Sequence, residues 1–131
     1  MTGLPNEPAG ALSRVEKELL ARWPESRIDW KLERMAALMH ALGDPHLAYP
    51  VIHVAGTNGK TSTARMADAL LRALGLRTGR NTSPHLESIT ERISIDGEPV
   101  SAQLFAQTYD QIAPFLDIVD AQSDVRLSFF E

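Results

Sequence analysis

The chain has 131 residues, 44% of them hydrophobic, which suits one globular domain with a single hydrophobic core. Its formal net charge of -4 and the absence of a basic cluster among its 13 Lys and Arg residues argue against a nucleic-acid or membrane partner. Cysteine is absent, which excludes disulfides, thiolate zinc sites and cysteine nucleophiles. Together with the lack of a signal-peptide pattern or a membrane-length apolar run, this predicts a cytoplasmic protein.

Two amphipathic helices are predicted in the N-terminal third. Apolar residues recur at helical spacing over residues 8–23, and Pro24 ends the pattern. A second pattern covers residues 32–42, and Gly43 follows where helices commonly end in a left-handed residue. We expect both to be packing helices.

The next segment predicts a strand, a loop, a helix and a second strand. Residues 51–55 are mostly apolar and β-branched, as is typical of a strand covered on both faces of a parallel sheet. A helical pattern begins at Thr61, and Gly75 is placed to cap its C-terminus. The second strand is expected at residues 77–82. This order predicts an α/β fold with a parallel sheet and a right-handed crossover.

A hairpin, a helix and a strand are predicted in the remainder. Asp96-Gly97, between residues 93–95 and Val100, tolerates the positive φ angles of a tight turn. A helical pattern opens at Ser101, and Pro114 is expected to kink or divide it. Residues 125–130 predict a final strand. Because a domain rarely stops directly after such a strand, we expect a longer domain.

The loop between the first predicted strand and helix has the features of a phosphate site. Successive backbone N–H groups and a helix N-terminus can surround a polyphosphate, and glycines allow a close approach. Lys60 can place its charge between the β- and γ-phosphates, which makes it the predicted catalytic residue, and the Thr61 hydroxyl can reach Mg²⁺. Val54 stands where the general Walker pattern has glycine, so the loop is a variant. The residues predicted to line this polyphosphate site are Gly56, Thr57, Asn58, Gly59, Lys60, Thr61 and Ser62.

Simpler structural roles compete with these assignments. A glycine-rich turn could merely join a strand to a helix, but such a turn has no need of Lys60. His40 and His46 have no metal-ligand spacing and are interpreted as surface or packing residues. His53 alternates with apolar residues in the first predicted strand and is interpreted as a core histidine.

Three segments resemble the signatures of one enzyme family, in the same order. Residues 52–62 resemble the phosphate loop of folylpolyglutamate synthases, whose pattern also lacks the Walker glycine at the Val54 position. Ser83-Pro84-His85-Leu86 followed by Glu91-Arg92-Ile93 resembles the second signature. Residues 127–131, an apolar stretch that ends in Phe-Glu, resemble the third. On these residues the chain resembles the folylpolyglutamate synthase/dihydrofolate synthase family of Mur ligases.

The resemblance covers residues 29–131 and implies an architecture. It implies part of a P-loop-type Mur ligase ATP-binding domain, with a parallel sheet, flanking helices and a small β-hairpin. Residues 1–131 would be the N-terminal portion of that domain, without its remainder and without the C-terminal glutamate-binding domain. The family's activating lysine and a later magnesium-binding histidine have no counterpart in these residues.

The resemblance also implies an activity and its site residues. The full-length enzyme would use ATP and Mg²⁺ to add L-glutamate to dihydropteroate or to a folyl-(poly)glutamate through an acyl phosphate. The residues from Gly56 to Ser62 would hold ATP. Ser83 and Glu131 would be magnesium ligands, with Thr61 as a further candidate, and His85 and Arg92 would contact the folate substrate. Hydroxyl and carboxylate oxygens are ligands that Mg²⁺ prefers.

Several alternatives stay open. Ser83 could be a turn residue before proline, and Glu131 could be an ordinary charge at a strand end. Lys31 replaces a family glycine in the segment 29–34, so this segment is either a pterin contact or an amphipathic helix with a solvated face. The isolated chain could be a nucleotide-binding fragment without turnover, and the enzyme could be another Mur-type ligase that acts on a peptidoglycan precursor.

Overall fold

The computed structural model describes residues 8–22, 24 and 32–131 of the chain. They belong to two compact units: unit 1 is Met1–Pro50 with Ala106–Glu131, and unit 2 is Val51–Phe105. Within the described ranges, no helix combines the length and the apolar character that crossing a membrane requires.

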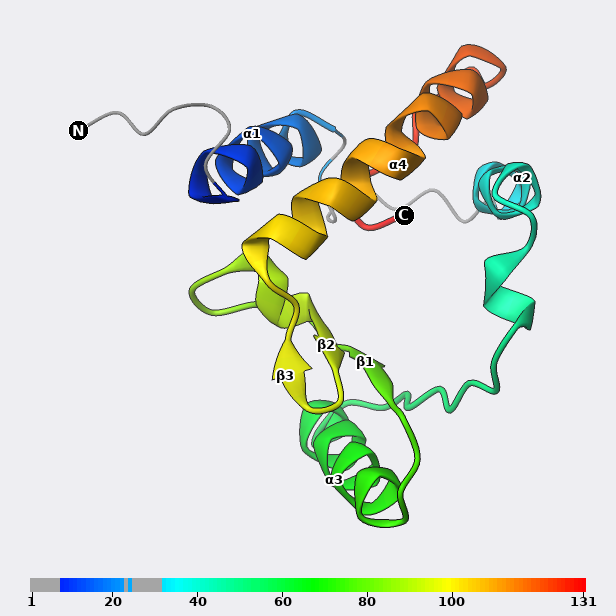
Figure 1. Ribbon diagram of the computed structural model, residues 1–131. Coiled ribbons are helices and arrows are strands. Elements are labelled where there is room, and N and C mark those ends of the chain that lie inside the picture. The colour runs from blue at the N-terminus through cyan, green and yellow to red at the C-terminus, as the bar shows by residue number, and fades with distance from the viewer. Residues whose placement is uncertain (1–7, 23, 25–31) are drawn as a thin grey trace. The chain divides into compact units, whose positions relative to one another are not determined.

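Unit 2 contains helix α3 (Lys60–Ala73) and a small antiparallel sheet, with strand order β1-β2-β3 (Figure 1). The strands are β1 (Gly79–Asn81), β2 (Ile93–Ile95) and β3 (Glu98–Pro99). A short 3₁₀ helix, η2 (Ile89–Arg92), leads directly into β2. The unit combines helix and sheet, as the predicted α/β class requires.

The hairpin between β2 and β3 confirms the prediction from Asp96-Gly97. Asp96 has a φ of 50° and Gly97 a φ of 90°, which are the left-handed angles of a tight hairpin turn. Ser94 lies opposite Pro99, and the Val100 N–H donates to the Ile93 carbonyl at 3.0 Å. The two turn residues, Asp96 and Gly97, therefore determine the hairpin locally.

The predicted parallel pairing is wrong for the strand at residues 77–82. Within it, β1 pairs antiparallel with β2, and Gly79 lies opposite Ile95. The predicted crossover needs a second parallel strand as a partner, whereas β1 pairs with the strand that follows η2. The connection after β1 thus turns the chain back on itself.

Residues 51–55 do not form the predicted covered strand. A strand needs hydrogen-bonded neighbours, and no strand of the described residues pairs with this run. The side chains of Val51 and Ile52 are each 68% exposed, and His53 is exposed rather than part of a core. Within the described residues, the apolar side chains of Val51 and Ile52 therefore stay largely uncovered.

A buried polar network joins α3 to the sheet in unit 2. The Asp68 carboxylate, in a residue only 5% exposed, accepts a hydrogen bond from the Thr78 hydroxyl at 2.5 Å and one from Arg80 Nη1 at 2.9 Å. Arg80 Nη2 donates to the Ser94 hydroxyl at 3.0 Å. Since breaking one side of a buried ion pair costs about 3–5 kcal/mol, this network fixes α3 against β1 and β2.

The C-terminus of α3 confirms the predicted glycine cap. Gly75 has a φ of 81°, its N–H donates to the Arg72 carbonyl at 2.9 Å, and the Leu76 N–H donates to the Leu71 carbonyl at 3.1 Å. These two bonds form the Schellman motif that commonly ends helices. The helix that follows the phosphate loop is therefore well terminated.

Unit 1 contains α1 (Pro8–Leu20), α2 (Glu33–Ala41), the 3₁₀ helix η1 (Pro45–Leu47) and most of α4 (Ala102–Ala121). The predicted helices are confirmed, although α1 stops at Leu20 and Trp23 lies outside the described residues. Pro114 lies within α4 and does not divide it. The core side chains come from α1, α2, α4 and the last segment: Val15, Leu38, Ala106, Tyr109, Leu116, Val119 and Leu127.

The predicted final strand at residues 125–130 is also wrong. Leu127 is 1% exposed, as a core strand residue would be, but side chains rather than a neighbouring strand satisfy its backbone. Its N–H donates to Asp120 Oδ1 at 2.8 Å, and its carbonyl accepts from Arg22 Nη1 at 3.2 Å. The segment is therefore a loop anchored to unit 1.

We expect the isolated 131 residues to self-associate. Large apolar side chains are exposed in both units, among them Ile52, Leu70 and Leu74 in unit 2 and Phe130 in unit 1. Water contact with such surface is unfavourable, so contact between copies is favoured. Sedimentation velocity over a concentration series should show growing association, with the full-length protein as the comparison. A monodisperse monomer with a highly cooperative melt would contradict this expectation.

Candidate functional site

The loop from Gly56 to Ser62 combines two left-handed glycines with a helix start. Gly56 has a φ of 146° and Gly59 a φ of 75°, and α3 begins at the next residue, Lys60. Residues other than glycine rarely adopt such angles, so both positions require glycine for conformation. The first N–H groups of a helix have no partner within the helix, and Gly59 has no side chain to cap them. The loop thus offers backbone donors to an anion.

Lys60 lies folded back over this loop. Its Nζ donates to the Gly56 carbonyl at 2.5 Å and is 3.4 Å from the Thr57 carbonyl. All seven residues from Gly56 to Ser62 are exposed, so the ammonium and the loop backbone are accessible. A phosphate at the loop would replace these neutral carbonyl acceptors of the ammonium with anionic oxygens.

Two of the three predicted magnesium ligands belong to unit 2. Thr61 lies in the first turn of α3, and Ser83 follows β1 by two residues. Both are exposed, and the Asp68 network holds together the two elements that carry them. The third, Glu131, belongs to unit 1. The complete ligand set therefore stays a prediction.

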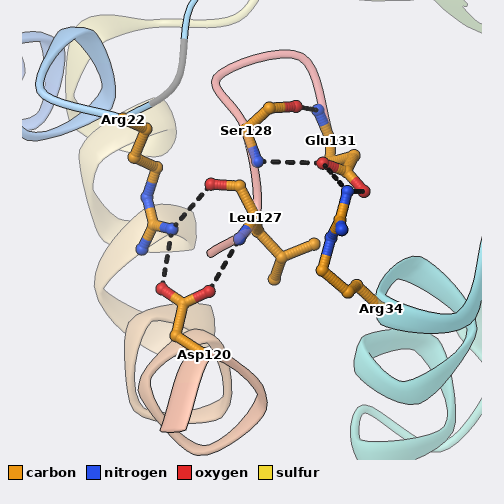
Figure 2. A network of polar contacts seen from close by, with 6 residues as sticks. All are labelled: Arg22, Arg34, Asp120, Leu127, Ser128 and Glu131. Atoms are coloured by element: carbon orange, nitrogen blue, oxygen red, sulfur yellow. Dashed lines mark hydrogen bonds and ion pairs between the residues drawn. The ribbon is translucent and has the colours of Figure 1, made fainter. Parts of the chain in front are cut away.

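The Glu131 carboxylate is held by two partners within unit 1 (Figure 2). Oε2 accepts from the Ser128 N–H at 2.9 Å, and Arg34 Nη2 lies 3.1 Å from Oε1 and 3.3 Å from Oε2. Its oxygens are hard donors, as are the hydroxyls of Thr61 and Ser83, so the donor chemistry fits Mg²⁺. In the described part of the chain, no group of three His, Asp or Glu residues could hold a metal ion.

His85 and Arg92, the predicted substrate contacts, lie together in unit 2. Arg92 Nε donates to His85 Nδ1 at 2.8 Å, and both residues are partly buried. Because the guanidinium can only donate, His85 Nδ1 must accept, which places the proton of the neutral ring on Nε2. The pair therefore presents a ring of defined tautomer beside a fixed positive charge.

Glu91 orders the loop that carries this pair. Its carboxylate accepts backbone hydrogen bonds from Leu86 at 3.0 Å, Glu87 at 2.9 Å and Ser88 at 2.8 Å. The Ser88 hydroxyl in turn accepts from the Thr90 N–H, which completes a capping box at η2. The N–H groups of Leu86, Ser88 and Glu87 hold the pKa of Glu91 below its ordinary value of 4.5.

We expect Glu91→Gln to loosen this loop in a pH-dependent way. Because the folded pKa of Glu91 is lowered, its contribution to stability is present above pH 4.5 and is lost as the pH falls through the folded pKa. Hydrogen exchange at Leu86 and Ser88 should therefore be faster in the variant than in wild type at pH 7, and the difference should shrink below pH 4.5. Glu87→Gln serves as the control. A difference that is constant with pH would contradict this assignment.

The remaining predictions have mixed outcomes. His40 and His46 are exposed, which confirms them as surface residues. In the segment 29–34, residues 29–31 lie outside the described residues, so its pterin contact is untested.

Sequence reasoning missed the partners of Arg34 and Asp68. A charged residue among the apolar positions of α3 was a signal for Asp68, but no local signal pairs Arg34 with a carboxylate 97 residues away.

Comparison with known sequences identifies relatives of the chain. No protein-family model matches it. It is 57% identical over 119 residues to the dihydrofolate synthase/folylpolyglutamate synthase of Mycobacterium tuberculosis. The aligned residues make up 91% of this chain and 24% of that protein. It is 38% identical over 89 residues to the enzyme of the same name from Bacillus subtilis, with 68% of this chain and 21% of that protein covered. The chain thus spans about a quarter of the length of these relatives.

Solved structures give the same result. The Mycobacterium tuberculosis folylpolyglutamate synthase complexed with ADP matches with a TM-score of 0.88 and 50% identity over 95% of this chain and 28% of that one. The folylpolyglutamate synthetase from Lactobacillus casei matches with a TM-score of 0.82 and 31% identity over 91% of this chain and 30% of that one. A folylpolyglutamate synthase complex with AMPPCP and folate matches with a TM-score of 0.82 and 30% identity over 91% and 29%. The chain belongs to the folylpolyglutamate synthase/dihydrofolate synthase family, with its Mur-ligase-type fold, and corresponds to the N-terminal part of these enzymes.

Proposed function

We propose that the full-length protein is an ATP-dependent ligase that adds L-glutamate to dihydropteroate or to a folyl-(poly)glutamate. The observation that carries this proposal is the loop Gly56–Ser62, with left-handed glycines at both ends of a turn and Lys60 at the start of α3. The relatives complexed with ADP, and with AMPPCP and folate, support the choice of ligands.

The reaction requires phosphoryl transfer followed by amide formation. The acceptor carboxylate attacks the γ-phosphorus of ATP, ADP leaves, and the glutamate amino group then displaces phosphate from the resulting acyl phosphate. Backbone N–H groups of the loop would hold the phosphates, and Lys60 would neutralise charge as the γ-phosphoryl group transfers. Mg²⁺, which would be held by Ser83 and Glu131 with help from Thr61, would supply further positive charge at the phosphates.

The acceptor would be oriented by the pair in the loop after β1. Arg92 offers a fixed guanidinium suited to a carboxylate, and His85 carries an N–H at Nε2 that can donate to a polar group. We propose that these two residues contact the folate substrate. No residue of this chain needs to become covalently modified in the reaction.

Mass spectrometry of the acceptor tests the proposal. The full-length protein is incubated with ATP, Mg²⁺, L-glutamate and either dihydropteroate or a tetrahydrofolate monoglutamate, while phosphate release is followed in parallel. The acceptor should gain one glutamyl group for each ATP converted to ADP and phosphate. Without glutamate, neither the glutamylated product nor free phosphate should form. Glutamylation of neither acceptor, together with activity on a peptidoglycan precursor, would favour another Mur-type ligase.

For the isolated 131 residues we propose nucleotide binding without turnover. The chain spans 24% of its Mycobacterium tuberculosis relative, and the resemblance assigns the glutamate-binding domain to residues that these 131 do not include. Calorimetry with ATP should therefore detect binding, whereas the acceptor assay should detect no product. Ligation by the isolated chain would overturn this proposal.

A further inference from the structure

Two arginines of unit 1, the buried Arg34 and the partly buried Arg22, hold the final segment, residues 127–131 (Figure 2). Arg34, from α2, is 7% exposed and reaches the Glu131 carboxylate, whose side chain is 16% exposed. Its Nη2 lies 3.1 Å from Oε1 and 3.3 Å from Oε2, so one nitrogen faces both oxygens. This contact brings together residues 97 positions apart, and it involves the carboxylate to which the proposed function assigns the magnesium ion.

A second contact fixes the orientation of the same carboxylate. Ser128 and Glu131 exchange hydrogen bonds: the Ser128 N–H donates to Oε2 at 2.9 Å, and the Glu131 N–H donates to the Ser128 hydroxyl at 3.2 Å. Oε2 therefore has two donors, whereas among the described residues Oε1 accepts from Arg34 only. Each carboxylate oxygen has two lone pairs, so Oε1 retains one for a metal ion.

We propose that Arg34 is a positioning residue, which holds the Glu131 carboxylate in the orientation that binds Mg²⁺. The inference rests on the proposed function, since that function places the ion at Glu131. A carboxylate with so little exposure has lost most of its hydration, and without a positive partner it would turn towards water. Groups that hydrogen-bond a metal-binding carboxylate typically change metal affinity about 10- to 100-fold when they are removed.

Competition between Arg34 and the metal ion would change the magnesium affinity in the opposite direction. A guanidinium beside a carboxylate can compete with a cation for it, in which case removing Arg34 would strengthen metal binding. The bond from the Ser128 N–H and the second lone pair of Oε1 favour positioning, because they leave an oxygen accessible while Arg34 stays in place. The direction of the change in magnesium affinity therefore decides between the two roles.

Arg22 provides a matched control in the same segment. It is also an arginine that holds residues 127–131: its Nη1 donates to the Leu127 carbonyl at 3.2 Å and to Asp120 Oδ2 at 2.9 Å. The side chains of Arg22 and Asp120 are 14% and 12% exposed, which is similar to the burial of the Arg34–Glu131 pair. None of the contacts described for Arg22 involves Glu131. A purely structural role for both arginines predicts similar consequences for both variants.

The experiment compares wild type, Arg34→Ala, Arg34→Lys and Arg22→Ala in the full-length protein. Two quantities are measured: the Mg²⁺ midpoint of ligation, and the Mg²⁺ affinity of the protein with AMPPCP by calorimetry. Arg34→Ala should raise both the midpoint and the dissociation constant about 10-fold or more, and Arg34→Lys should recover part of the loss. Arg22→Ala should change both by less than about twofold, because its described contacts do not involve Glu131. In a Glu131→Gln background, Arg34→Ala should cause no further change.

Three results would overturn the inference. They are an unchanged magnesium affinity in Arg34→Ala, a higher one, and an equal loss in Arg22→Ala. If Arg34→Ala fails to fold, as thermal melts would reveal, Arg34→Lys carries the test, because its shorter reach and single point charge should still shift the midpoint. A wild type that binds Mg²⁺ with AMPPCP but does not ligate would refute the proposed function alone, and the calorimetric comparison would still decide the role of Arg34.

Discussion

Replacing Lys60 with alanine is expected to weaken ATP binding about 10- to 100-fold and to reduce ligation by more than it reduces binding. Lys60 is the single charged residue in the loop Gly56–Ser62, and a charge-assisted hydrogen bond is worth about 1.5–3 kcal/mol. The reduction in rate should be larger because negative charge on the phosphoryl oxygens must be stabilised as the group transfers. The fold should survive, since Lys60 is exposed and contacts only loop carbonyls in its described hydrogen bonds.

Calorimetry of ATP binding and the rate of glutamate ligation measure these two effects in the full-length protein. Lys17→Ala is a matched control, because Lys17 is an exposed lysine in the last turn of α1. It should behave like wild type in both assays. Wild-type affinity together with wild-type ligation in Lys60→Ala would remove the loop from the mechanism.

Replacing Glu131 with glutamine is expected to reduce magnesium-dependent turnover about 10- to 100-fold while ATP affinity changes much less. Main-chain donors of the phosphate loop hold the nucleotide regardless of Glu131, whereas a neutral amide lacks the charge that would fix the metal ion. The amide oxygen can still accept from the Ser128 N–H, so the turn at residues 128–131 should persist.

A magnesium titration of the ligation rate, with ATP affinity measured alongside, distinguishes these effects. Glu98→Gln makes the same chemical change at an exposed position of β3 and should leave both quantities unchanged. A Glu131→Gln variant with the wild-type rate and magnesium midpoint would show that Glu131 has no part in binding the ion. Thermal melts check that loss of the Arg34 partner charge has not unfolded unit 1.

The elements that sequence analysis predicted well depend on local signals. Helical periodicity located α1, α2, α3 and α4, and the left-handed glycine after α3 marked its end. The hairpin at Asp96-Gly97 was predictable because two adjacent residues with positive φ determine the turn. The phosphate loop was recognisable for the same reason, since its residues are contiguous and its chemistry does not depend on distant partners.

Strands were harder to predict because their pairing is not local. Residues 51–55 and 125–130 both have the composition of covered strands, yet in the described residues neither has a strand beside it. Leu127 is nevertheless buried, and its backbone is satisfied by Asp120 and Arg22 instead. Apolar composition thus agrees with the burial of Leu127, but it does not determine which groups pair with its backbone.

The same limit applies to the polar contacts around the candidate site. Asp68 pairs with Arg80 across the boundary between a helix and a strand, and Arg34 pairs with Glu131 across 97 positions. Many carboxylates in the sequence could have served as either partner, and only the packed chain selects one. Sequence reasoning therefore named Glu131 as a ligand by resemblance, but it did not find the residue that holds it.

The sharpest test of nucleotide binding at Gly56–Ser62 is a crystal structure of the full-length protein with Mg²⁺ and AMPPCP. We expect the β- and γ-phosphates to lie against the backbone N–H groups of this loop, with Lys60 Nζ moved from the Gly56 carbonyl to a phosphate oxygen. A nucleotide bound elsewhere, with Lys60 Nζ still on the Gly56 carbonyl, would contradict the assignment of this loop.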